Sequence, residues 1–365
     1  MLRWHFFGSL QYSAKPIRPL YEQILTQFRA WVHNLGTLLL PLNLNIDYDF
    51  PISHSIREPQ VLLAILILTV LAGVIWHVSR SRRLVGFFAL WFAVTLAPTS
   101  SIVPLEDVVA DRWLYLPSIG FIGIAVLAGE WLFKKAISGK PRVYYLVFFF
   151  LCALPLELYA FSTVLRNFTW RSEWTLWEDT VEKSPDKARA RVGLGLAYMN
   201  AGRHPEAVRQ FEWAMKLDPK DGRPYLNLGL IYYWQNRNEE AITLYRKAIR
   251  FGSRLASEGH NNIALAYLKM GKKQEALKEF QKAIEIRPIN ANPYYNLGVY
   301  YGDNGDMDTA ISYLEKAVEI EPEFYWAYMI LSRVYERKGW QEKSKEAYLK
   351  YAERALKRIK YLPGR

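Results

Sequence analysis

The chain changes character once, near Trp170. Before this residue it contains apolar segments long enough to cross a bilayer, and after it a pattern of about 34 residues recurs to the C-terminus. A membrane-embedded half joined to a repeat array is incompatible with a free enzyme in solution. The side of the membrane on which the repeats lie therefore decides which molecules they can meet.

Four segments of the first half are expected to span the membrane. Residues 61–78 are uncharged and reach about 18 residues, close to the shortest length of a spanning helix. The other three candidates are Leu84–Pro98, Leu114–Phe133 and Val143–Leu165. Residues 24–42, interrupted by Arg29, His33 and Asn34, form either a fifth span or an interfacial helix. We therefore expect a membrane-associated segment over residues 1–60 and four transmembrane helices over residues 61–165.

The charges of the short loops predict the orientation. Arginines at 80, 82 and 83 join the first two strong spans, and four basic residues between 134 and 142 join the last two. Residues 99–112, between these pairs, carry three acids against one arginine. Because basic loops stay cytoplasmic, the acidic loop and everything after Leu165 should face outward. We expect an integral membrane protein, in a bacterial inner membrane, with periplasmic repeats; in a eukaryote they would be lumenal.

The second half is a tandem repeat. Successive units start at Ala188, Gly222, Ser257, Ala291 and Tyr325, at steps of 34, 35, 34 and 34 residues. Their small, aromatic and proline residues recur at fixed places in the tetratricopeptide pattern, in which each unit is a pair of antiparallel helices. We expect five such repeats over residues 188–360, preceded by a connector and capping helix over residues 166–187. The predicted fold class is therefore all-α: a polytopic transmembrane bundle followed by a tetratricopeptide α-solenoid.

Composition excludes several functions. The formal charge of +12 is spread through repeat helices and loops without a compact basic patch, so we expect no nucleic-acid partner. Cys152 is the only cysteine, and the six histidines lack ligand-like spacing, so we expect no disulfide and no metal site. No sequence motif identifies a catalytic residue or a cofactor.

Two outward segments carry candidate site residues. Arg112, beside Asp111, is either a clamp for a lipid-linked phosphate or an interfacial anchor placed at headgroup level with Tyr115. Asp47 and Asp49 flank a tyrosine in another outward segment, where a base or metal ligand is conceivable and turn or cap chemistry explains them as well.

These segments resemble one family. Residues 111–120 (DRWLYLPSIG), residues 43–51 (NLNIDYDFP) and a connector holding Arg166, Asn167, Trp170, Leu176 and Trp177 are similar to the transmembrane and tetratricopeptide repeat-containing protein O-mannosyltransferases and their bacterial relatives. That resemblance implies a polyprenyl-phosphate-linked sugar donor, for which Asp111, Arg112 and Tyr115 are the candidate site, and acceptor proteins held by the repeats.

One departure from the family limits this expectation. The family's catalytic acid lies in a loop after its first membrane helix, and the chain begins too late to contain it. The resemblance therefore implies either a C-terminal piece of a split or truncated transferase, with a separate subunit carrying the catalytic loop, or a family member that has lost its catalytic part. In both cases the chain alone should not be a competent transferase. The competing hypothesis is a non-enzymatic scaffold anchored among membrane lipids that assembles an envelope complex.

The repeats contain a candidate peptide-binding pattern. Asn227, Asn262 and Asn296 occupy the sixth place of three consecutive units. Because an amide both donates and accepts hydrogen bonds, a ladder of amides can hold an extended peptide backbone of any sequence. The alternative is that asparagine is simply common at this place of the repeat.

Overall fold

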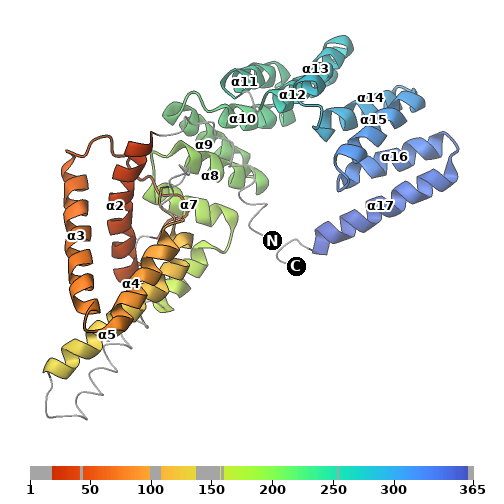
Figure 1. Ribbon diagram of the computed structural model, residues 1–365. Helices are drawn as coiled ribbons and strands as arrows, with labels where there is room; N and C mark the ends of the chain where they lie inside the picture. Colours follow the sequence, from red (N-terminus) through yellow and green to blue (C-terminus); the bar gives the residue numbers. More distant parts are fainter. Residues whose placement is uncertain are drawn as a thin grey trace. The chain divides into compact units, whose positions relative to one another are not determined.

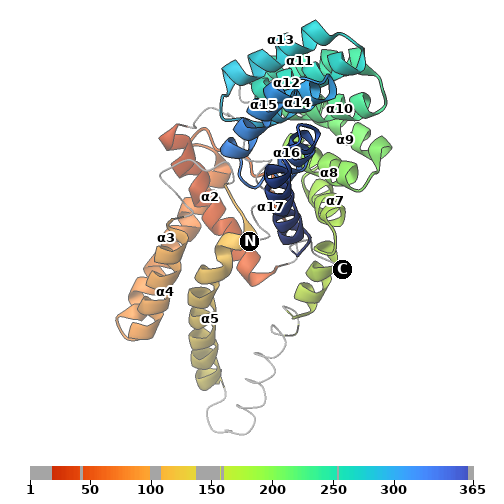
Figure 2. The ribbon, with the colours of Figure 1, turned by 90° about the vertical axis from the view of Figure 1, so that its right-hand side faces the viewer.

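Helices account for all the regular structure in residues 19–41, 44–98, 108–136, 157, 160–252 and 255–360, which the computed structural model describes. Figures 1 and 2 show their course. These residues fall into two compact units, which divide between Ala201 and Gly202. The all-α prediction is confirmed.

The first unit contains the apolar helices. They are α2 (Leu20–Leu39), α3 (Pro59–Ser79), α4 (Arg83–Leu96) and α5 (Tyr115–Ala136), the last preceded by a single 3-10 turn, η1 (Asp111–Leu114). Helix α3 packs beside both α2 and α4, and α4 pairs with α5 (Figure 1). Residues 24–42, the weakest candidate span, thus lie largely within a continuous helix.

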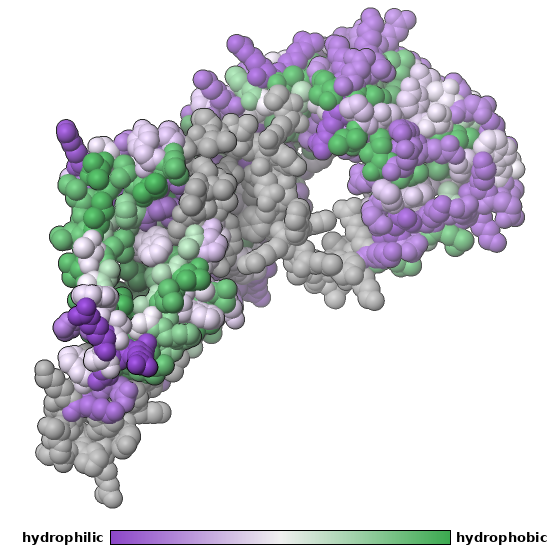
Figure 3. Space-filling view, in the orientation of Figure 1, coloured by the Kyte–Doolittle hydropathy of each residue, from purple (hydrophilic) through white to green (hydrophobic). Residues whose placement is uncertain are grey.

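Among the described residues, α3 alone is both long and apolar enough to cross a membrane, whereas α4 and residues 115–131 form shorter apolar helices. Most of the predicted span at 143–165 lies outside the described residues. The large apolar side chains of α3 stay on the surface, and Leu66, Val70 and Trp76 are 60%, 56% and 61% exposed. Figure 3 shows apolar residues gathered over this part of the first unit and hydrophilic ones over the repeats.

Two further helices of the first unit lie at its C-terminal end. Helix α7 (Glu173–Lys183) begins at a capping box, in which Ser172 and Thr175 each bond the other's backbone N–H. Helix α8 (Ala188–Asn200) packs against α7, and a Cβ added to Gly193 would lie 2.6 Å from the Trp177 ring. The predicted helix before the repeats therefore exists and covers the first helix of the array.

The second unit continues the array. Its helices are α9 (His204–Leu217), α10 (Gly222–Trp234), α11 (Asn238–Phe251), α12 (Ala256–Lys269), α13 (Lys273–Ile286), α14 (Ala291–Asp303), α15 (Met307–Ile320), α16 (Tyr325–Arg337) and α17 (Gln341–Lys360). Helices α8, α10, α14 and α16 begin at the residues where the sequence pattern starts its units, and α12 begins one residue earlier.

A left-handed residue ends the first helix of every repeat. Glycine holds this place four times, with φ between 74° at Gly271 and 87° at Gly305. In the second repeat Asn236 holds it, with φ of 63°. Asparagine is among the few side chains that tolerate this conformation, which explains why the repeat pattern survives the substitution.

Small residues bring the two helices of a repeat together. A Cβ on Gly229 would lie 2.6 Å from the Tyr245 ring, and one on Gly298 would lie 2.5 Å from Leu314 Cγ. Tyr245 and Leu314 are fully buried there, and the core clusters continue from one repeat into the next. Each repeat therefore completes its core only with its neighbours, as in other solenoids.

Candidate functional site

The predicted donor residues lie at the start of α5. Leu114, the last residue of η1, is buried with Leu38 of α2 and Leu96 of α4, so this corner is fixed between those helices. Tyr115 is 80% exposed. The side chains of Asp111 and Arg112 lie outside the described residues, so the phosphate-clamp role of Arg112 stays a prediction.

The asparagines at the sixth place of the repeats are half-buried. The next residue of each unit is in the core, as the repeat pattern predicts: Leu228, Ile263 and Leu297 are no more than 3% exposed. The amide of Asn227 donates to Arg223 O in its own helix at 2.9 Å.

The other two asparagines belong to a chain of amides that joins two repeats. Asn296 Nδ2 donates to Asn261 Oδ1 at 2.8 Å, and Asn261 Nδ2 donates to Asn262 Oδ1 at 3.2 Å. Asn261 is 5% exposed and links α12 to α14. Asn262 and Asn296 therefore help to hold two neighbouring repeats together. Peptide binding by Asn227, Asn262 and Asn296 stays a prediction.

The most strongly constrained polar group in the first unit is the carboxylate of Asp47, which is 2% exposed. Arg189 Nε donates to Asp47 Oδ2 at 2.7 Å, and Arg189 Nη2 and Lys187 Nζ both contact Asp47 Oδ1. Both oxygens are thus occupied by cations at the start of α8. The described contacts of the Asp47 carboxylate are those of an ion-pair partner, and its roles as a base, a metal ligand or a turn residue stay hypotheses.

The neighbours of Asp47 extend this contact. Asn45 makes the turn, since its Oδ1 accepts from the backbone N–H of Asp47 at 3.2 Å, while its Nδ2 donates to Ser184 Oγ at 2.9 Å. The same Ser184 Oγ accepts from the backbone N–H of Asp49 at 3.1 Å. We name this set, residues 44–49 against residues 183–189, the junction clamp. It holds the first helix of the repeat array to the segment that follows α2.

The clamp was not predicted from the sequence, although residues 43–51 and the connector before the repeats both drew attention as segments. The cations at Lys187 and Arg189 resemble the many surface cations of a chain with 47 lysines and arginines. The only available signal was the occurrence of two acids in one short segment and of two cations at the start of the first repeat.

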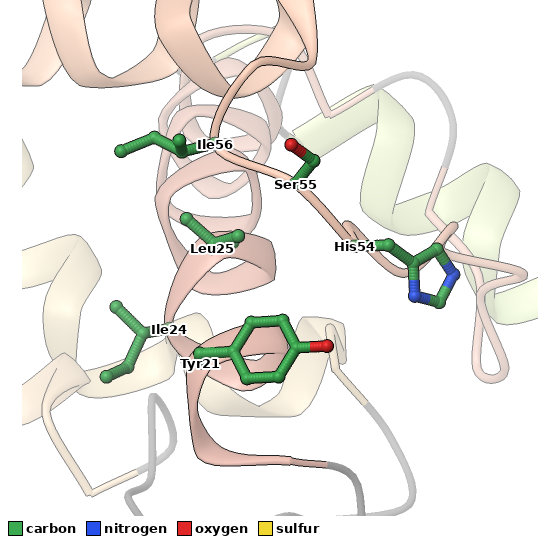
Figure 4. A pocket seen from close by; sticks show the side chains of 6 residues that line it. All are labelled: Tyr21, Ile24, Leu25, His54, Ser55 and Ile56. Atoms are coloured by element: carbon green, nitrogen blue, oxygen red, sulfur yellow. The ribbon is translucent and has the colours of Figure 1, made fainter.

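A shallow cleft of about 410 Å³ lies beside the start of α2. Figure 4 shows its lining, in which Tyr21, Ile24 and Leu25 of α2 face the segment carrying Ile56 and His54. Glu22, which does not line the cleft, accepts a hydrogen bond from the ring of His54 at 3.0 Å. This hydrogen bond and the negative charge of Glu22 raise the pKa of His54. The lining is mainly apolar, and its polar side chains are those of Tyr21, His54 and Ser55.

The described residues contain no cluster of three or more histidine, cysteine, aspartate or glutamate side chains that could hold a metal ion. Within them, polar contacts of the first unit gather both at the junction clamp with its connector and between α2 and residues 53–58.

Comparison with known families confirms the repeats. Models of the tetratricopeptide repeat match residues 175–212, 192–258, 291–324 and 327–357, and a TPR repeat model matches residues 264–305. The crystal structure of MamA is 28% identical, with a TM-score of 0.37, and the match covers 46% of this chain and 98% of MamA.

Curated relatives match much more of the chain. Protein O-mannosyl-transferase TMTC3 of Mus musculus is 26% identical over 351 residues, which cover 93% of this chain and 35% of the relative. Tmtc3 of Drosophila melanogaster is 24% identical over 309 residues, covering 78% of this chain and 32% of the relative. The chain thus spans about a third of the length of these proteins. Because the similarity runs through the N-terminal half as well as the repeats, the chain is a homologue of the TMTC protein O-mannosyl-transferases.

Proposed function

We propose that the chain is a membrane-anchored, extracytoplasmic repeat protein that forms part of a polyprenyl-phosphate-sugar-dependent protein O-glycosyltransferase. Its repeats would hold acceptor proteins, and a separate subunit would carry the catalytic loop. The observation that carries the proposal is the similarity to protein O-mannosyl-transferases over 93% of the chain, because a likeness of repeats alone would stop at the array.

The surface of α3 supports the membrane anchor. Leu66, Val70 and Trp76 are more than half exposed along a helix of 21 residues, long enough to cross a hydrocarbon core of about 30 Å. The short loop after it, with Arg80, Arg82 and Arg83, favours a cytoplasmic end. The segment before α3, which forms the junction clamp, would then lie outside, on the side proposed for the repeats.

The junction clamp supports the role of the repeats. A flexible connection would let a bound acceptor protein move away from the membrane surface. The buried ion pair at Asp47 instead fixes α8 to the segment between α2 and α3. The start of the array would therefore stay close to the membrane surface, where a lipid-linked sugar is available.

The orientation can be tested with reporter fusions. An externally active reporter should work after Gly202 and Gly305, and a cytoplasmic one after Ser138. The reverse pattern would overturn the extracytoplasmic placement of the repeats.

The function can be tested by deleting the gene from its host and measuring O-linked hexose on extracytoplasmic proteins by mass spectrometry. We expect a subset of proteins to lose the modification and the intact chain to restore it. A chain truncated after Ala201 should restore nothing although it inserts normally. Unchanged glycosylation together with the loss of an envelope complex would overturn the proposal in favour of the scaffold.

A further inference from the structure

A second cleft of the first unit, of about 260 Å³, lies where the end of α2 meets the connector. Pro41 and Leu44 line it together with side chains of the helical segment before α7, among them Ser162, Arg166 and Asn167. Its volume is below the ~300–1,000 Å³ of pockets that enclose a whole small molecule, so it suits a head group whose remainder lies outside.

The charge beside this cleft is positive. Arg166 Nη1 donates to Asp179 Oδ2 at 2.7 Å, and Lys183 Nζ donates to Asp179 Oδ1 at 2.6 Å and to Leu44 O at 2.8 Å. Two cations thus share one carboxylate, which leaves one net positive charge. The side chains of Arg166 and Asp179 are 15% and 16% exposed, so this charge is only weakly screened by water.

Hydrogen-bond donors remain for a ligand. A guanidinium has five N–H donors, and the described contacts of Arg166 use one of them. Within the described part of the chain, the side chains of Ser162 and Asn167 have no hydrogen-bond partner, and both line the cleft. Trp170, which also lines it, is 54% exposed, as is common for tryptophan at a membrane interface.

Apolar side chains flank the polar ones along the same two segments. Leu39 and Leu40, just before Pro41, are both 64% exposed, and Phe161, just before Ser162, is 63% exposed. A free anion would have no use for this apolar surface, whereas an amphiphile would cover it with its hydrocarbon chain.

We propose that this cleft binds the phosphate head group of a membrane amphiphile. Arg166 would hold the phosphate oxygens through its unused N–H groups, with Ser162 and Asn167 donating to the same oxygens or to adjacent hydroxyls. The phosphate would neutralise the net charge left by Arg166, Asp179 and Lys183. The inference rests on the membrane anchoring in the proposed function and not on transferase activity.

The test uses the full chain purified in detergent, with lipid retention measured by native mass spectrometry and stability by thermal unfolding. The probes are phosphatidylglycerol, a polyprenyl phosphate, phosphatidylcholine and inorganic phosphate. Asn167→Leu removes a donor at similar volume, and Arg166→Lys keeps the charge but loses the planar fork. Asn200→Leu, which changes an exposed amide at the end of α8, is the matched control.

We expect the chain to retain one of the two anionic lipids in preference to phosphatidylcholine and to be stabilised by it, and the stronger of the two identifies the source. Asn167→Leu should weaken retention roughly tenfold, the effect of about 1.4 kcal/mol, while Asn200→Leu leaves it unchanged. Equal retention of phosphatidylcholine, or equal stabilisation by inorganic phosphate, would overturn the proposal. Lipid selectivity without any effect on protein glycosylation would refute the proposed function alone.

Discussion

Replacing Asp47 by asparagine should destabilise the first unit far more than the loss of one ordinary ion pair. The change leaves the cations of Arg189 and Lys187, 13% and 21% exposed, without their carboxylate. Breaking a buried ion pair on one side costs roughly 3–5 kcal/mol. Lys187 keeps its contact with Tyr48 O, and both cations keep some water, so we expect about 3 kcal/mol. For a unit of this size that corresponds to a loss of about 6–12 °C in Tm.

The measurement is thermal unfolding of the full chain in detergent, followed by tryptophan fluorescence. Trp177 reports on the relevant region because it is 4% exposed between α7 and α8. Glu240→Gln is the control, since its pair with Arg237 is exposed on both sides and should contribute little to stability.

A double variant tests the cause. Asp47→Leu combined with Arg189→Leu removes both main charges and should recover part of the loss, because apolar pairs replace buried ion pairs with little cost. If Asp47→Asn lowers Tm no more than Glu240→Gln does, the carboxylate does not hold the clamp and the reasoning fails.

Four further outcomes are expected. Asn236→Val should lower the free energy of unfolding by about 1–2 kcal/mol, because the φ of 63° at this position is left-handed. Asn236→Gly should leave it unchanged or raise it, and urea unfolding of the chain distinguishes the two variants. Asn296→Ala should lower the free energy of unfolding by about 1–3 kcal/mol, since it leaves the buried Oδ1 of Asn261 without its donor. Asn227→Ala should lower it by less than about 1 kcal/mol. Equal losses would contradict the amide chain. Arg112→Lys should weaken binding of a polyprenyl phosphate without changing expression, and full tolerance would favour the anchor role. The pKa of His54 is raised from 6.5, so its contact with α2 is complete below pH 6.5 and is lost as the pH rises through the folded-state pKa. The protection of residues 54–58 against hydrogen exchange should fall over that range. In His54→Gln this protection should show no such fall.

The repeat half could be predicted closely because its pattern is local and repeated. Each helix pair lies within one 34-residue unit, so the starts at Gly222, Ala291 and Tyr325 follow from alignment alone. Asn236 stands at the place where the other units have the turn glycine, and it takes the same left-handed conformation. The amide chain through Asn261 was missed because it joins two different places of neighbouring units, which a one-position alignment cannot show.

The junction clamp was unpredictable for a different reason. Its partners are 135 to 142 residues apart, so no periodicity relates Asp47 to Arg189 or Asn45 to Ser184. An acid in an outward segment is compatible with turns, metals, catalysis and ion pairs. Only the 2% exposure of the Asp47 side chain and the two cations that face it identify the ion pair.

That sequence separation also fixes the order of biosynthesis. Asp47 leaves the ribosome 142 residues before Arg189, a delay of about 7–28 s at ~5–20 residues per second. During this time the Asp47 carboxylate has neither of its cationic partners, because Lys187 and Arg189 have not yet been synthesised. The clamp can therefore close only after the chain has been made as far as α8.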